Sequence, residues 1–120
     1  MTLAGFILLL LTAVLMAGAN VLMKTGIEKA GGFAPTLSAL LALIAQPRFT
    51  LGFLLSGVAA LLWFRILATQ KLSTCYPLFV GLTFSLIALG SFFLLHEKLS
   101  TQKIAGLAVI VVGISIVARG

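Results

Sequence analysis

The sequence predicts an all-α membrane protein, namely a bundle of four transmembrane helices with a short interfacial or re-entrant helix between the first two. Of its 120 residues, 62% are hydrophobic and only 8% are charged, whereas a soluble domain carries about 25% charged residues. The hydrophobic residues also form four long stretches separated by charged residues, glycine or proline. A helix of about 20 apolar residues crosses the hydrocarbon core of a bilayer. Such a chain cannot cover a water-facing surface, so the membrane is its solvent.

The first apolar stretch, residues 3–23, ends at Lys24. No basic segment precedes this stretch, and no small-residue cleavage site leads from it into a soluble domain. We therefore interpret it as a retained transmembrane helix rather than a signal peptide. The small residues 17–19 form a patch suited to close helix contact. Asn20 lies one turn before Lys24, so the two side chains share a helical face.

The connection between residues 25 and 48 is the only extended one in the chain. It contains the helix-breaking pair Gly31-Gly32 and an apolar segment, residues 36–45, that is too short to span a membrane. Pro35 fits the beginning of a helix in this segment, and Pro47 fits the position just past its end. We therefore expect a short helix that lies in the membrane interface or re-enters the membrane. A buried connector helix is the alternative.

Three further transmembrane helices are expected near residues 49–68, 76–95 and 104–118. The third organises the chain, since it opens with Tyr76-Pro77, continues without charge to Leu95 and stops at an ionisable cluster beginning with His96. Trp63 in the second helix suits an interfacial position. Short loops between long helices predict an up-and-down arrangement. We expect the whole chain, residues 1–120, to form a single four-helix transmembrane domain.

The charged residues lie mostly at the ends of the apolar stretches. The formal net charge is +6, because eight Lys or Arg residues stand against only Glu28 and Glu97. In a soluble protein this excess would suggest nucleic acid; here the expected partner is anionic membrane lipid, with no nucleic acid. Arg65 is the exception to the pattern, because it precedes Lys71 by about 9 Å of helix. It either snorkels to the surface or faces an internal cavity.

No combination of residues predicts a catalytic or metal site. His96 has no Cys or His partner at the spacing of metal ligands, and the hydroxyls of Ser85 and Ser91 have no base nearby in the sequence. Cys75 is the only cysteine, so no internal disulfide is expected. We therefore expect neither enzyme activity nor a cofactor nor a bound metal.

The distribution of basic residues predicts an orientation in the membrane. Lys and Arg in short loops favour the cytoplasm. The loops after the first and third transmembrane helices carry five of these residues, whereas the opposite side carries two, or three if Arg65 is counted. We therefore expect both termini on the periplasmic side. The excess is small, which is also typical of a subunit in a dual-topology pair.

Three segments together resemble the drug/metabolite transporter superfamily. They are AGANVLMKTG (17–26), the pair Tyr76-Pro77, and LHEKLSTQKIAGLAVIVVGI (95–114). Their order and spacing resemble its four-helix members, the small multidrug resistance proteins and the small EamA-type proteins, over nearly the whole chain. The resemblance implies a multi-pass protein of the bacterial inner membrane.

The two four-helix branches imply different substrates. Small multidrug resistance proteins couple drug export to protons through a glutamate in their first helix. The position eight residues before Lys24 is Met16, and residues 3–23 contain no carboxylate, so no group there could exchange a proton for a cationic drug. The chain also resembles the paired flippase subunits for undecaprenyl-phosphate-linked aminoarabinose. That resemblance implies flipping of an anionic lipid-linked sugar used in lipid A modification, which suits the basic charge of this chain.

A four-helix protomer is too thin to enclose a polar path, so we expect a homodimer or a heterodimer with a related four-helix subunit. Lys24 and Arg65 are the candidate phosphate contacts, and Asn20 and Tyr76 are candidate hydrogen-bond donors. Lys24 could equally be an interface anchor, Arg65 a snorkelling residue and Tyr76 part of an aromatic belt. These alternatives remain open.

The two acidic residues, Glu97 and Glu28, have either a coupling or a structural role. The structural role expected for Glu97 is to cap the following loop or to pair with Lys98 or Lys103. Three functions remain open for the whole chain: a lipid-sugar flippase subunit, a small-multidrug-resistance-like exporter of small metabolites or drugs, and a non-transporting accessory membrane protein.

Overall fold

The computed structural model describes residues 2–120, and these residues form five α-helices and no strand. The helices are α1 (Leu3–Lys29), α2 (Leu37–Ala45), α3 (Pro47–Thr69), α4 (Leu72–Leu94) and α5 (Thr101–Arg119). The four long helices, α1, α3, α4 and α5, are each long and apolar enough to cross a membrane. The prediction of an all-α protein with four membrane-spanning helices and one short helix between the first two is therefore confirmed.

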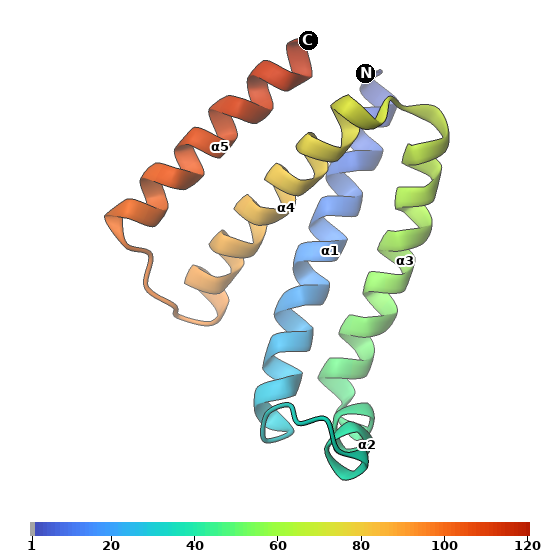
Figure 1. The fold of residues 1–120 in the computed structure, drawn as a ribbon, viewed down its shortest axis with the longest axis vertical. Coiled ribbons are helices and arrows are strands. Elements are labelled where there is room, and N and C mark those ends of the chain that lie inside the picture. The colour runs from blue at the N-terminus through green and yellow to red at the C-terminus, as the bar shows by residue number, and fades with distance from the viewer. Residues whose placement is uncertain (1) are drawn as a thin grey trace.

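The four long helices lie side by side in the order α3, α1, α4, α5 (Figure 1). The described residues measure 48 × 37 × 21 Å, and the shortest of these dimensions is about two helix diameters. Helix α1 packs closely against both α3 and α4, whereas α5 packs mainly against α4 and has no buried residue. The four-helix unit is therefore an open layer rather than a closed bundle.

Small residues bring α1 and α3 close together. A Cβ atom built at Gly52 of α3 would lie 2.8 Å from the Ala19 carbonyl oxygen, and one at Gly26 of α1 would lie 2.5 Å from the Phe49 backbone nitrogen. Of the patch predicted at residues 17–19, the two alanines are buried, but Gly18 faces open space with no atom within 4 Å of its Cβ position. Close packing in this layer therefore depends more on Gly52 and Gly26 than on Gly18.

The most deeply buried side chains lie where α1, α3 and α4 meet, towards the end of the layer that carries both termini. Leu9, Ile66, Cys75 and Leu78 form this core, each at most 1% exposed. Trp63 packs beside them, with its ring centroid 4.5 Å from that of Phe79 and 5.9 Å from that of Tyr76. Towards the other end, α4 and α5 lean away from α1 and α3 (Figure 1).

The first helix is longer than the predicted span. Helix α1 continues past residue 23 to Lys29, because the next helix-breaking residues are Gly31 and Gly32, whose φ angles are +94° and +101°. Thr36 caps α2 by accepting a hydrogen bond from the Ala39 N–H, so Pro35 precedes the cap instead of opening the helix. Pro47 is the first residue of α3, which is the position where its missing N–H costs least.

The third span begins earlier than predicted. Helix α4 starts at Leu72 rather than at residue 76, and Pro77 lies inside it. The backbone N–H groups of Thr74 and Cys75 both donate to the Lys71 carbonyl, which forms the first turn before the proline is reached. Pro77 then removes a single hydrogen bond, the one that its N–H would donate to the Ser73 carbonyl. Helix α5 likewise begins about one turn before residue 104, because Ser100 caps it through the Lys103 N–H.

Candidate functional site

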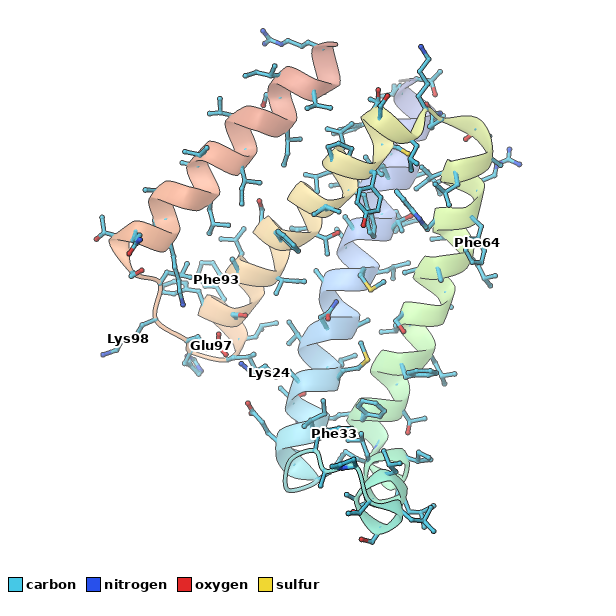
Figure 2. All side chains as sticks on the ribbon, viewed as in Figure 1. Lys24, Phe33, Phe64, Phe93, Glu97 and Lys98 are labelled. Atoms are coloured by element: carbon cyan, nitrogen blue, oxygen red, sulfur yellow. The ribbon has the colours of Figure 1, made fainter. Side chains whose placement is uncertain are left out.

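One ion pair joins the two halves of the layer. Lys24 of α1 donates a hydrogen bond from its ammonium group to the Glu97 carboxylate in the loop between α4 and α5, and it is the only salt bridge within residues 2–120. Figure 2 shows Lys24 reaching towards Glu97 while Lys98 points away. The partner of Glu97 is therefore Lys24 rather than Lys98 or Lys103. The two paired side chains are 49% and 42% exposed, so ligands and water reach both.

Local backbone geometry places Glu97 for this contact. His96, two residues after the last residue of α4, has a φ of 55°, which is the left-handed conformation that often ends helices. The chain turns there, and the Glu97 N–H donates to the Ser91 carbonyl at 3.0 Å. The hydrogen bond from Lys24 is the main reason that the pKa of Glu97 lies below its ordinary value, and the positive charge of Lys103 adds to the effect. Glu97 is thus a carboxylate at neutral pH.

Lys24 also borders a shallow hollow of about 470 Å³ between α1 and α3. Asn20 and Glu28 line it together with apolar side chains, including Phe49. The Asn20 amide donates one hydrogen bond to the Met16 carbonyl at 2.8 Å, which leaves its second N–H free to bind a ligand. Four of the sequence-predicted residues, Asn20, Lys24, Glu28 and Glu97, therefore lie at the same end of the layer.

Arg65 lies far from these residues. Gly5 of α1 lies beside the side chain of Gln70, the residue after α3, and Gly26 lies level with Phe49 of α3, so Lys24 is level with about residue 51. Arg65 is fourteen residues farther along α3, which amounts to about 21 Å at 1.5 Å per residue. Lys24 and Arg65 of one subunit therefore do not reach the same phosphate group in this conformation.

Tyr76 lies at the same end of the layer as Arg65, but the two residues lie on different sides of α3. Tyr76 packs on Trp63, and Trp63 and Arg65 are two residues apart, or about 200° around the helix. Arg65 is exposed, and its side chain projects from the opposite face of α3. The structure thus brings the predicted residues together in one group of four and leaves Arg65 and Tyr76 separate.

Two hollows at the far end involve residues that the sequence did not single out. One has a volume of about 680 Å³ and is lined by Lys71, Ser73 and Thr74 at the start of α4, together with the end of α3 and the residues that flank α1 and α5, Thr2 and Gly120. The other is an apolar groove of about 370 Å³ between α4 and α5, bordered by Tyr76 and Gly113. The cluster of Ser and Thr residues beside Lys71 is the sequence signal that could have identified the first hollow.

The described residues contain no preassembled centre for metal binding. Among residues 2–120, no three His, Cys, Asp or Glu side chains lie close enough to hold a metal ion. Cys75 is buried and free, and the Ser85 hydroxyl donates to the Gly81 carbonyl of its own helix at 2.9 Å. The charged and polar side chains that the site does present, Lys24, Glu97 and Asn20, are suited to charge pairing and hydrogen bonding.

Comparisons with known proteins agree with a transporter-like role. The chain is 38% identical to a probable 4-amino-4-deoxy-L-arabinose-phosphoundecaprenol flippase subunit ArnE of an Enterobacter species over 64 residues, which are 53% of this chain and 59% of that protein. It is 36% identical to the protein of the same name from Erwinia tasmaniensis over 63 residues, 52% of this chain and 57% of that one. The matches thus span little more than half the length of these two relatives.

A third relative matches over a longer segment. The chain is 29% identical to the uncharacterized protein y4nH of Sinorhizobium fredii over 104 residues, 84% of this chain and 83% of that protein. No protein-family model matches the chain, and no solved structure matches it. Together with the four helices that can span a membrane, the two flippase-subunit relatives support a multi-pass membrane protein with a transporter-like role.

Proposed function

We propose that this chain is one subunit of a flippase that moves a polyprenyl-phosphate-linked aminosugar across the bacterial inner membrane, for the modification of lipid A. The observation that carries the proposal is its similarity to two probable aminoarabinose-phosphoundecaprenol flippase subunits, found in a chain with four helices able to span the membrane. The similarity covers about half of the chain, and the proposal extends the activity named for these relatives to the whole protein.

The open layer of helices supports a paired subunit. A layer about two helices thick has no interior in which a charged sugar head group could cross hydrocarbon. A second four-helix subunit, either another copy or a related chain, would supply the other wall of a polar path. Two such subunits would imitate the repeats from which larger transporters are built. The path can stay open to lipid on one side, so that the polyprenyl tail remains in the bilayer while the head group crosses.

The charges favour an anionic substrate over a cationic drug. The net charge is +6, and α1 contains no carboxylate before Glu28, in its last turn. A proton-coupled exporter of cations needs an acidic group within the membrane to exchange its proton for the drug. In this chain Met16, eight residues before Lys24, stands where the resemblance to small multidrug resistance proteins would place that glutamate. Export of small metabolites or drugs and a non-transporting accessory role are the competing functions, and transport measurements separate them.

Translocation can be measured in vesicles that contain the chain and its candidate partner. The aminosugar carries a primary amine, so a membrane-impermeant amine-reactive reagent labels only lipid-linked sugar in the outer leaflet. With a functional flippase, labelling should rise from the outer-leaflet fraction towards completion. Labelling that stays at the level of protein-free vesicles, for the chain alone and with every related four-helix partner, would refute the proposal. Uptake of a cationic dye driven by a pH gradient would instead favour the exporter.

A further inference from the structure

The polar hollow at the α3–α4 end is suited to an anion. Its wall consists of hydroxyl and amide side chains together with Lys71 and Gly120, and its volume is about 680 Å³. Arg65 and Arg119 lie at the same end, whereas Glu28 and Glu97, the only acidic residues of the chain, lie at the opposite end. Lys71, the cation among the residues that line the hollow, therefore has no acidic side chain to neutralise it, and a charge-assisted hydrogen bond to a phosphate would satisfy it.

An apolar groove continues from this hollow into the membrane-spanning part of the layer. On α4, Ser73 lines the hollow and Pro77 lines the groove, and residues four apart share a helical face. Val117 of α5 lines the groove and Gly120, the residue after α5, lines the hollow; the Gly120 N–H donates to the Val117 carbonyl at 3.1 Å. The hollow therefore lies one turn beyond the groove, at the start of α4 and just past the end of α5.

The groove is apolar and long enough to hold part of a hydrocarbon chain. It extends along α4 from Tyr76 to Phe84 and holds about 370 Å³. Eight residues at 1.5 Å each give a length of about 12 Å. The groove can therefore hold part of a hydrocarbon tail whose charged head lies in the polar hollow.

We propose that this composite site binds a polyprenyl phosphate, with its phosphate beside Lys71 in the polar hollow and the first part of its isoprenoid tail in the groove between α4 and α5. The inference rests on the proposed function, because it specifies where the lipid-linked substrate of the flippase is held. It assigns a binding role to Lys71 and to the groove beside Tyr76. Gly113 keeps the groove open, since no atom lies within 4 Å of the position that its Cβ would occupy.

Gly113→Leu tests the tail site. No atom lies within 4 Å of the position that its Cβ atom would occupy, so the added side chain has room at its base to extend into the groove that Gly113 lines. Gly106→Leu is the matched control, because Gly106 lies two turns earlier on α5, also faces open space and does not line the groove. The probe is a photoactivatable short-chain polyprenyl phosphate added to the full chain in phosphatidylcholine vesicles. Gly113→Leu should reduce labelling at least fivefold, Gly106→Leu should leave it unchanged, and Gly113→Ala should have an intermediate effect.

Lys71→Gln tests the phosphate site, with Lys98→Gln at the other end of the layer as the control. Lys71→Gln should weaken competition by unlabelled polyprenyl phosphate about tenfold, whereas Lys98→Gln should not alter it. Uncharged polyprenol should compete poorly. Equal competition by phosphatidylglycerol would mean that the site holds a phospholipid and would overturn the inference. Equal loss of labelling in Gly106→Leu and Gly113→Leu would overturn it as well.

The remaining occupant of the groove is a second copy of the chain. If Gly113→Leu dissociates a subunit pair while lipid labelling persists, the groove belongs to a subunit interface and the inference is wrong. Failure here is distinguishable from failure of the proposed function. If translocation is observed but Gly113→Leu is labelled as strongly as the unaltered chain, this binding site is refuted and the flippase is not. If labelling depends on Gly113 and Lys71 but no translocation is observed, the flippase is refuted and the binding site is not.

Discussion

The close approach of α1 and α3 predicts that Gly52→Ala destabilises the protein. A Cβ atom at position 52 would lie 2.8 Å from the Ala19 carbonyl oxygen and 2.8 Å from Cγ of Met23. Ordinary contact begins at 3.4 Å, so the helices must separate by about 0.6 Å or the side chains must shift. The carbonyl oxygen belongs to the backbone of α1 and cannot rotate away. The strain therefore has to spread along the α1–α3 contact.

The magnitude follows from a comparison within the same helix. Gly57→Ala makes the identical chemical change in α3, but no atom lies within 4 Å of its Cβ position. Both substitutions gain the backbone entropy advantage of alanine in a helix, roughly 0.5–1 kcal/mol, so this contribution cancels in the difference. What remains is the cost of overpacking, about 1–3 kcal/mol. Gly52→Ala should thus be less stable than Gly57→Ala by this amount, with a tenfold change in the unfolding equilibrium for every ~1.4 kcal/mol.

Unfolding by SDS in mixed micelles, followed through Trp63 fluorescence, measures this difference. Trp63 is the only tryptophan and packs against Phe79 beside the core, so its emission reports the contact between α3 and α4. Equal unfolding free energies for Gly52→Ala and Gly57→Ala would refute the close contact at Gly52. A larger loss for Gly57→Ala would show that the exposed face of α3 is covered by a partner.

Three further predictions concern charge. The pKa of Glu97 is lowered, so its pairing with Lys24 contributes stability at neutral pH, and this stability is lost as the pH falls below the ordinary carboxyl value of 4.5 and the carboxylate is protonated. Hydrogen exchange in the 95–100 loop, corrected for its intrinsic rate, should accelerate in that pH range. The Glu97→Gln variant should show no such acceleration. Lys24→Ala and Arg65→Ala should each weaken substrate binding more than folding, and their effects should add because the two sites are about 21 Å apart; normal translocation in both variants at normal expression would remove them from the site. Reporter fusions at Gly120 should be active only with the periplasmic reporter; activity only with the cytoplasmic one would show that the basic-residue count misleads, and activity with both would indicate dual insertion.

The long-range order of the fold could be predicted from the sequence because the membrane imposes it. Four apolar stretches of sufficient length determine four spans. The short helix is determined by the Gly31-Gly32 pair before it and by the prolines on either side of it, Pro35 and Pro47. Helix ends were harder to predict. Pro77 was interpreted as the beginning of a helix, but the hydrogen bonds from Thr74 and Cys75 to the Lys71 carbonyl form a complete turn before it. A proline near a helix start therefore marks the beginning only to within a turn.

The arrangement of the candidate site depends on contacts between distant segments, which sequence spacing does not reveal. Asn20 and Lys24 could be placed on one face because they are four residues apart. The pairing of Lys24 with Glu97, 73 residues away, depends instead on α1 and α4 running side by side in the same direction (Figure 1) and on the left-handed turn at His96. The separation of Arg65 from Lys24 likewise follows from the antiparallel packing of α3 on α1. The apolar groove requires two helices and could not be recognised from either one.

Native mass spectrometry of the gently extracted protein tests the central claim, a paired flippase subunit for a lipid-linked sugar. A membrane that makes both the candidate partner and the lipid-linked aminosugar is the appropriate source. The expected mass is that of two four-helix subunits, either two copies of this chain or this chain with a related one, together with a bound polyprenyl-phosphate lipid that collisional activation releases. A monomer without bound polyprenyl phosphate, under conditions in which a known membrane dimer stays intact, would contradict the claim.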